Sequence, residues 1–148
     1  MNTRTRMRRR AQSAIAGLGA MVAVFLMPGQ AHAALVSWDL EGTGSGVVGA
    51  HAWGSLSLGS DGRYYLTANI KDTAADGHGA RLEVMAYYND GWDSRYENLN
   101  ATGNQATNSY TWNFASDMDY VDARECLTEQ GEEYRCASKW YVIYRAHP

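Results

Sequence analysis

The fold class of this chain is decided by the stretch from residue 70 to residue 84, which reads Ile70-Lys71-Asp72-Thr73-Ala74-Ala75-Asp76-Gly77-His78-Gly79-Ala80-Arg81-Leu82-Glu83-Val84. Apolar and polar residues alternate on both sides of a turn rich in Asp and Gly, which is the pattern of two antiparallel strands joined by a tight reversal. We therefore predict a β-hairpin here, with Asp72 capping backbone amides in the turn and Gly77 at a positive φ.

The same alternation continues along most of the chain after residue 33, and no segment shows a sustained helical period with capping residues. It predicts strands over 35–40, 48–58, 64–70, 80–88, 110–114, 120–127 and 134–145, with residues 94–108 as a polar loop or a weak edge strand. About seven or eight short strands with frequent turns predict an all-β, single-domain antiparallel β-sandwich, with a small β-barrel as the alternative.

Residues 1–33 have the features of a secretory signal peptide. Five arginines between residues 4 and 10 precede a mostly apolar segment, and Ala31-His32-Ala33 fits the small-x-small pattern of a cleavage site. The apolar segment is too short and too interrupted for a membrane anchor, which is the alternative interpretation. We therefore expect a secreted protein whose domain comprises residues 34–148 and makes no membrane contact after cleavage.

Removal of residues 1–33 would leave a strongly acidic protein. The chain has 13 Lys and Arg against 16 Asp and Glu, and five arginines but no acidic residue lie in the first 33. Eight basic and sixteen acidic residues then remain, which is a net charge of −8. Such a protein repels phosphate backbones and anionic lipids, so we expect no nucleic acid among its partners.

The chain has two cysteines, Cys126 and Cys136, separated by ten residues. In an exported chain such a pair predicts a disulfide, whereas a zinc site would need further Cys or His nearby, and only His147 is close in sequence. We expect the two Cα atoms to lie about 4.4–6.8 Å apart across neighbouring strands.

Three features of the sequence occur together in a known group of proteins. They are the Asp72-Thr73-x-x-Asp76-Gly77-x-x-Ala80 turn, an Asp-Gly turn about a dozen residues later, and a C-terminal strand pair that holds the two cysteines. Over most of residues 46–140 the chain resembles the small exported β-sandwich proteins of high-GC Gram-positive bacteria (actinobacteria). The resemblance implies export and the sandwich fold, and it assigns no catalytic residue.

The turn after Ile70 also has part of the spacing of a calcium loop. If Asp72 is the first position, Asp76 is the fifth, Gly77 the sixth and Glu83 the twelfth, while Ala74 lacks an oxygen at the third. Asp72, Asp76 and Glu83 would then form a weak Ca²⁺ site, with a dissociation constant of roughly 10⁻⁴–10⁻³ M. The strand patterns on both sides favour a plain turn instead, in which case no cofactor is expected.

Two further patterns give little support for catalysis or cofactor binding. Gly44-Ser45-Gly46-Val47-Val48-Gly49 matches the letters of a dinucleotide-binding motif, but a strand-like segment follows where that mechanism needs a helix. We therefore interpret it as a glycine-rich connection. His51 and His78 lie in no recognisable nucleophile motif, so a hydrolase would require one of them in a cleft, bonded to a carboxylate and near a Ser or Thr.

Aromatic residues, with five Trp and ten Tyr, are the remaining signal. Trp53, Tyr65 and Tyr87 fall on the opposite faces of their strands from the apolar residues, and Trp92 lies at the tip of a turn. Exposed aromatic residues beside carboxylates and amides form carbohydrate platforms and protein-binding faces. The alternative is that these aromatic residues are buried in a second packed layer.

We predict a non-catalytic binding module for a glycan or an extracellular protein surface. A small secreted hydrolase and an effector or inhibitor of one protein partner are the alternatives.

Overall fold

The computed structural model describes residues 34–89 and 93–146, so the predicted signal peptide, the turn that contains Trp92, and residues 147–148 lie outside the described residues. Within these ranges the chain forms strands and loops but no helix that could cross a membrane. The strands are β1 (Ala34–Asp39), β2 (Ala50–Leu58), β3 (Tyr64–Asp72), β4 (Gly79–Tyr88), β5 (Ser94–Ala101), β6 (Thr107–Phe114), β7 (Met118–Glu129), β8 (Glu132–Cys136) and β9 (Tyr141–Arg145).

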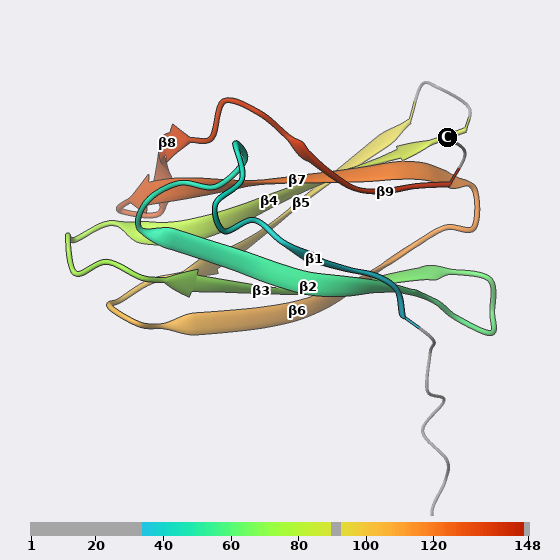
Figure 1. Ribbon diagram of the computed structural model, residues 1–148, viewed down its shortest axis with the longest axis horizontal. Coiled ribbons are helices and arrows are strands. Elements are labelled where there is room, and N and C mark those ends of the chain that lie inside the picture. The colour runs from blue at the N-terminus through green and yellow to red at the C-terminus, as the bar shows by residue number, and fades with distance from the viewer. Residues whose placement is uncertain (1–33, 90–92, 147–148) are drawn as a thin grey trace, which may run out of the picture.

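The strands form two antiparallel sheets that pack face to face (Figure 1). Sheet A has the order β1-β2-β3-β6 and is the lower layer in Figure 1. Sheet B has the order β5-β4-β7-β8, with β9 also pairing with β7, and is the upper layer. The two sheets do not close on each other, so the predicted β-sandwich is confirmed and the barrel alternative is wrong.

The core lies between the sheets and consists of the inward-facing residues of each strand. Leu56, Leu66 and Ile70 from sheet A and Leu82 and Val84 from sheet B are completely buried. They occupy alternate positions along their strands, as the sequence pattern predicts, because successive side chains of a strand point to opposite faces. The burial of this apolar surface is the main force that holds the two sheets together.

The stretch from Ile70 to Val84 does not form the predicted hairpin. β3 pairs with β2 and β6 in sheet A, whereas β4 pairs with β5 and β7 in sheet B, so the turn between them crosses from one sheet to the other. Alternation specifies which side chains face the core, and it is the same for strands paired in one sheet and strands stacked across a sandwich. The details of the turn are confirmed, since the Asp72 carboxylate accepts a hydrogen bond from the Ala74 amide at 3.2 Å and Gly77 has a φ of 86°.

The polar segment 94–108 contains the whole of one strand and the start of another, rather than a single loop. β5 is an edge strand of sheet B and β6 an edge strand of sheet A, and residues 102–106 connect the two sheets. Their polar composition is explained by this edge position, where most side chains stay exposed. At the C-terminus, the single strand predicted over 134–145 divides into β8 and β9, which pair with different parts of β7.

Cys126 and Cys136 form the predicted disulfide, which joins directly paired residues of β7 and β8. Their Cα atoms are 3.9 Å apart, below the range of about 4.4–6.8 Å that we predict from the sequence, so the pairing is confirmed and the separation is not. The turn between these strands is formed by Gln130 and Gly131, both at positive φ, which matches the right-handed twist of a hairpin.

We expect replacement of both cysteines by alanine to lower the free energy of unfolding by roughly 2–3 kcal/mol, because the bridge closes a loop of about ten residues. Urea unfolding followed by tryptophan fluorescence measures this loss. Equal unfolding midpoints for the wild type and the variant would contradict the expectation, as would two free thiols in the mass spectrum of the wild type.

Candidate functional site

The outer surface of sheet A carries aromatic, hydroxyl and amide side chains in neighbouring rows. β2, β3 and β6 pair in continuous register, so every second residue of each strand points outward. We call this surface the sheet A face. Its outward residues are His51, Trp53, Ser55 and Ser57 on β2, Tyr65, Thr67, Asn69 and Lys71 on β3, and Thr107, Ser109, Thr111 and Asn113 on β6.

Hydrogen bonds between strands fix the polar groups of the sheet A face. The Thr67 and Thr111 hydroxyl oxygens are 3.0 Å apart, and the Ser109 hydroxyl donates to the Asn69 amide oxygen at 2.6 Å. The Asn69 amide nitrogen donates to the backbone carbonyl oxygen of Trp53 at 3.2 Å. Because these partners come from three strands of one sheet, the face is ordered before any ligand arrives, which lowers the entropic cost of binding.

Trp53 and Tyr65 supply the two aromatic rings of the face, and both are half-buried. The Tyr65 hydroxyl donates a hydrogen bond to the Asp61 carboxylate at 2.7 Å, which raises the pKa of Tyr65 and lowers the pKa of Asp61. The Trp53 ring centroid lies 4.7 Å from that of His51. Both rings therefore have a partner that limits their rotation while part of each stays accessible.

The structure does not bring Tyr87 together with Trp53 and Tyr65. Tyr87 lies on β4 in sheet B, where it stacks on Tyr120 at 4.2 Å between ring centroids. The chain changes sheet between β3 and β4, so an outward residue of β4 points to the opposite side of the sandwich. Trp92, the fourth aromatic residue predicted for this face, lies outside the described residues.

His51 lies at the end of the sheet A face beside two carboxylates. Its Nε2 atom is 3.0 Å from Oδ1 of Asp39 and 4.0 Å from Oε2 of Glu41. A hydrolase would also need a nearby hydroxyl nucleophile, and within the described part of the chain no Ser or Thr hydroxyl is hydrogen-bonded to His51. His78, the other candidate, stacks on Tyr134 in sheet B at 4.4 Å.

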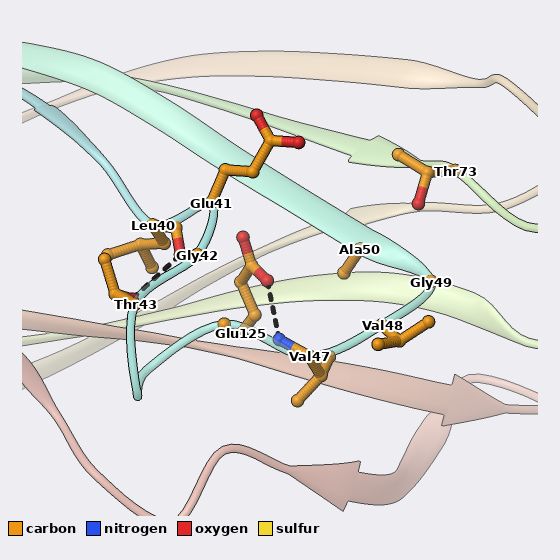
Figure 2. Close-up of a pocket in the computed structure, with 11 residues that line it drawn as sticks. Leu40, Glu41, Gly42, Thr43, Val47, Val48, Gly49, Ala50, Thr73 and Glu125 are labelled. Carbon is orange, nitrogen blue, oxygen red and sulfur yellow. Dashed lines mark hydrogen bonds between the residues drawn. The ribbon is translucent and has the colours of Figure 1, made fainter.

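A buried glutamate holds the glycine-rich loop that joins β1 to β2. Glu125 on β7 is 1% exposed, and its two carboxylate oxygens accept hydrogen bonds from the Val47 amide at 2.9 Å and the Ala52 amide at 2.6 Å. Figure 2 shows the carboxylate pointing from β7 into the loop. Burial raises the pKa of Glu125 to about 7, although the two amide hydrogen bonds lower it. Since both oxygens bind backbone amides of the protein, we assign Glu125 an anchoring role.

The loop and Glu125 line a cavity of about 340 Å³, whose lining includes Glu41 and Thr73. The glycines of the loop allow the backbone to approach Glu125 closely. A Cβ atom at Gly46 would lie 2.7 Å from the Leu40 carbonyl oxygen and 3.2 Å from the Glu125 carboxylate. The segment 44–49, which matches a dinucleotide-binding motif in sequence, is therefore a loop in which the Val47 amide binds the Glu125 carboxylate of the protein itself.

Sequence reasoning missed Glu125, although the sequence contains a signal for it. On β7 the core-facing residues are Val121, Ala123 and Leu127, at every second position. Glu125 lies at the position between Ala123 and Leu127 that faces the same way, toward the core. A charged residue among inward-facing apolar positions requires buried hydrogen-bond partners. That requirement predicts a polar contact inside the sandwich, but not the loop that provides it.

The three carboxylates of the predicted calcium site make separate contacts. Asp72 accepts hydrogen bonds from the Ala74 amide and, at 3.1 Å, from the Gly103 amide, whereas Asp76 accepts one from the His78 amide at 3.0 Å. Glu83 lies on the outer side of sheet B. Among the described residues, neither group of side chains close enough to share a metal ion includes Asp72 or Asp76. This placement supports the plain turn.

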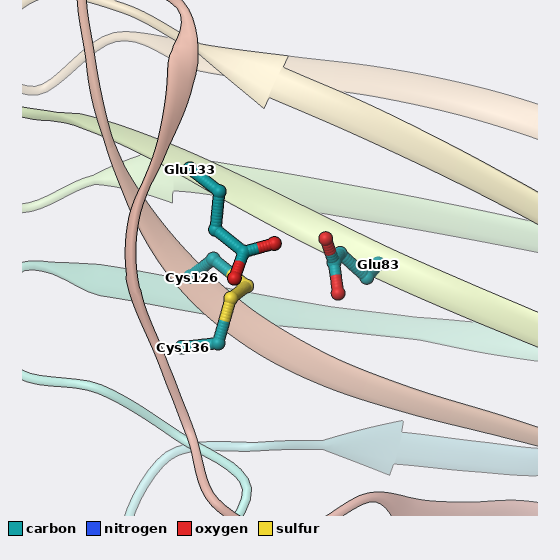
Figure 3. Close-up of side chains that lie close together, drawn as sticks. All are labelled: Glu83, Cys126, Glu133 and Cys136. Atoms are coloured by element: carbon teal, nitrogen blue, oxygen red, sulfur yellow. A yellow bond between two sulfur atoms is a disulfide. The ribbon is translucent and has the colours of Figure 1, made fainter.

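Glu83 is itself buried and is part of a cluster of side chains next to the disulfide (Figure 3). Its carboxylate is 2.8 Å from Nε of Arg124 and accepts a hydrogen bond from the Tyr96 hydroxyl at 2.7 Å. Burial and this hydrogen bond raise the pKa of Tyr96 to about 12. Glu133, Cys126 and Cys136 lie beside Glu83, but sulfur atoms joined in a disulfide are not the thiolates that a metal binds.

The sheet A face and the His51 cluster at its end therefore form the candidate functional site. Both lie on sheet A. The glycine-rich loop between β1 and β2 is attached to sheet B by its hydrogen bond to Glu125 on β7. Comparison of the chain with family models, with curated proteins and with solved structures found no match.

Proposed function

We propose that the protein is an extracellular, non-catalytic binding module that recognises a glycan through the sheet A face. The observation that carries this proposal is the presence of two aromatic rings, Trp53 and Tyr65, among ordered rows of hydroxyl and amide groups on one sheet. Aromatic rings stack on the apolar faces of sugar rings, and amide and hydroxyl groups match sugar hydroxyls as donors and acceptors.

The composition of the sheet A face favours a glycan over a protein surface. The buried centres of protein–protein interfaces are depleted in Ser and Lys and enriched in aromatic residues, Met and Arg. The sheet A face instead carries Ser, Thr and Asn residues beside its two aromatic rings. A polar surface of this kind matches the many hydroxyls of a sugar, which would otherwise lose hydrogen bonds to water on binding.

An extracellular location is supported by two independent features. Residues 1–33 have the charge and hydropathy pattern of a signal peptide. The Cys126–Cys136 disulfide fits an oxidising compartment, where such bonds form and persist.

The proposal is tested by measuring binding to a panel of polysaccharides, namely cellulose, chitin, xylan and an α-glucan, by affinity electrophoresis or sedimentation. We expect at least one to bind, and Trp53→Ala to weaken that binding by about 30-fold or more, as loss of a central aromatic contact costs about 2 kcal/mol or more. Tyr87→Ala is the matched control, because Tyr87 lies on the opposite sheet. The proposal fails if no polysaccharide binds or if Tyr87→Ala weakens binding as much as Trp53→Ala.

A further inference from the structure

Three side chains with metal-binding atoms converge where β1 ends and β2 begins. Asp39 is the last residue of β1, Glu41 follows it in the loop, and His51 lies near the start of β2. Pairing of β1 with β2 places Asp39 and His51 on the same outer surface. The Glu41 amide donates a hydrogen bond to Oδ1 of Asp39 at 2.8 Å, and the resulting turn directs the Glu41 side chain toward the His51 ring.

The geometry of the three side chains suits one metal ion. The imidazole nitrogen of His51 and one carboxylate oxygen each from Asp39 and Glu41 all lie within 4.8 Å of one another. Two ligands of a tetrahedral zinc ion, each about 2.0–2.2 Å from the metal, are about 3.3–3.6 Å apart. The distances from His51 Nε2, 3.0 Å to Asp39 and 4.0 Å to Glu41, lie on either side of this range. Small side-chain rotations are therefore sufficient to form the site.

The charges and the donor atoms also favour a divalent transition metal. Among the ion pairs of the described residues, those of Asp39 and Glu41 both involve His51, which supplies at most one positive charge to two carboxylates. A divalent cation neutralises both. Imidazole nitrogen is a ligand that zinc, copper and nickel prefer, whereas calcium and magnesium prefer oxygen ligands alone.

We propose that Asp39, Glu41 and His51 form a binding site for a divalent transition-metal ion of the zinc class. Three protein ligands leave at least one position of a zinc ion open, as in zinc sites that bind water or a substrate. The Asp39 and Glu41 side chains are 54% and 79% exposed, so the ion is reached from solvent. Glu41 also lines the cavity under the glycine-rich loop, so this cavity adjoins one of the three proposed ligands.

Trp53 provides a built-in reporter for this site. Its ring centroid is 4.7 Å from the His51 ring, close enough for a bound paramagnetic ion to quench its fluorescence. Zn²⁺ does not quench in this way. Titration with Zn²⁺ therefore measures how tightly the site binds a metal, and quenching by a paramagnetic ion shows whether the bound metal lies near Trp53. The site does not depend on glycan binding, and the following experiment measures metal binding alone.

The experiment titrates Zn²⁺ by isothermal calorimetry into the purified protein, prepared without a polyhistidine tag and freed of metal with a chelator. We expect one equivalent to bind, and His51→Ala to weaken binding by more than about tenfold, which is the lower limit for loss of even an outer partner of a metal ligand. Asp39→Asn is a second variant; its amide oxygen still accepts the Glu41 hydrogen bond but carries no charge, so we expect weaker binding there too. His78→Ala is the matched control and should bind Zn²⁺ as the wild type does, since His78 lies in the turn between β3 and β4.

Quenching of tryptophan fluorescence by Cu²⁺ tests whether the bound ion lies at the proposed site. Cu²⁺ should quench part of the tryptophan fluorescence of the wild type, and Trp53→Phe should remove most of that quenching while the Zn²⁺ affinity stays within about twofold. The proposal is overturned if the wild type binds no Zn²⁺, or if His51→Ala, shown to be folded by its thermal unfolding, binds Zn²⁺ with unchanged affinity. Quenching by Cu²⁺ that is equal in Trp53→Phe and the wild type would also overturn it, because the ion would then lie elsewhere.

Discussion

Replacing Arg124 with alanine is expected to lower the free energy of unfolding by about 3–5 kcal/mol. The guanidinium Nε of Arg124 lies 2.8 Å from a Glu83 carboxylate whose side chain is only 3% exposed, and the guanidinium also covers the Trp140 ring at 4.6 Å. Without Arg124, Glu83 keeps the hydrogen bond from Tyr96, but its charge is buried without a cation. A buried charge that loses its partner is among the most destabilising changes in a protein interior.

Chemical denaturation at pH 7 measures this loss, and two further variants test its cause. The double variant Glu83→Gln/Arg124→Met removes both charges and should recover most of the stability, because no isolated charge remains. Arg95→Ala removes a partly exposed ion pair with Glu97, a hydrogen bond to the Asn113 carbonyl oxygen and a contact with the Phe114 ring. It leaves no fully buried charge, so it should cost less than Arg124→Ala. If the double variant is as unstable as Arg124→Ala, the burial of an unpaired charge is not the cause.

Replacing Glu125 with alanine is expected to lower the free energy of unfolding by about 3 kcal/mol at pH 5. The change leaves the Val47 and Ala52 amides without their partner inside the sandwich, and each unsatisfied buried amide costs about 1–3 kcal/mol. It also removes the side chain of sheet B that binds the glycine-rich loop at Val47 and the start of β2 at Ala52.

The cost of Glu125→Ala should decrease as the pH rises from about 4.5 to about 7. Burial raises the pKa of Glu125 to about 7 in the folded protein, while an unfolded glutamate has a pKa near 4.3. Between these values the folded state holds a proton that the unfolded state has released, so the stability that Glu125 contributes is complete below about pH 4.3 and is lost as the pH rises through 7. The full decrease is up to about 4 kcal/mol.

Unfolding free energies of the wild type and Glu125→Ala between pH 4 and pH 8 test this dependence. Glu41→Ala is the control, because Glu41 is an exposed carboxylate in the same loop and should change the stability by less than about 0.5 kcal/mol at any pH. A difference between the wild type and Glu125→Ala that is constant, or that grows with pH, would contradict the anchoring role of a carboxyl with a raised pKa.

The sequence was sufficient to predict the sandwich, because alternation shows which residues face the core. Leu66, Ile70, Leu82 and Val84 are buried as expected. It could not show that β3 and β4 lie in different sheets, since alternation is the same for paired and for stacked strands. This ambiguity also explains Tyr87, whose outward orientation is correct but whose sheet is the opposite one.

The candidate site was predictable only in part. Alternation places Trp53 and Tyr65 on an outer face, and the register of β2 and β3 puts them on the same one. The cluster of Asp39, Glu41 and His51 depends on the pairing of β1 with β2 and on a turn at Asp39, which no local pattern in the sequence specifies. Contacts between side chains on different strands require the register, and the register becomes known only with the fold.

The most direct test of the binding face is a map of backbone amide chemical shifts, recorded by NMR while the polysaccharide fragment that binds best is added to the purified protein. We expect the largest changes on β2, β3 and β6, around Trp53, Tyr65 and Asn69, with little change on β4, β5 and β7. Changes centred on the outer surface of sheet B, around Tyr87 and Tyr120, would contradict the assignment of the sheet A face as the glycan-binding surface.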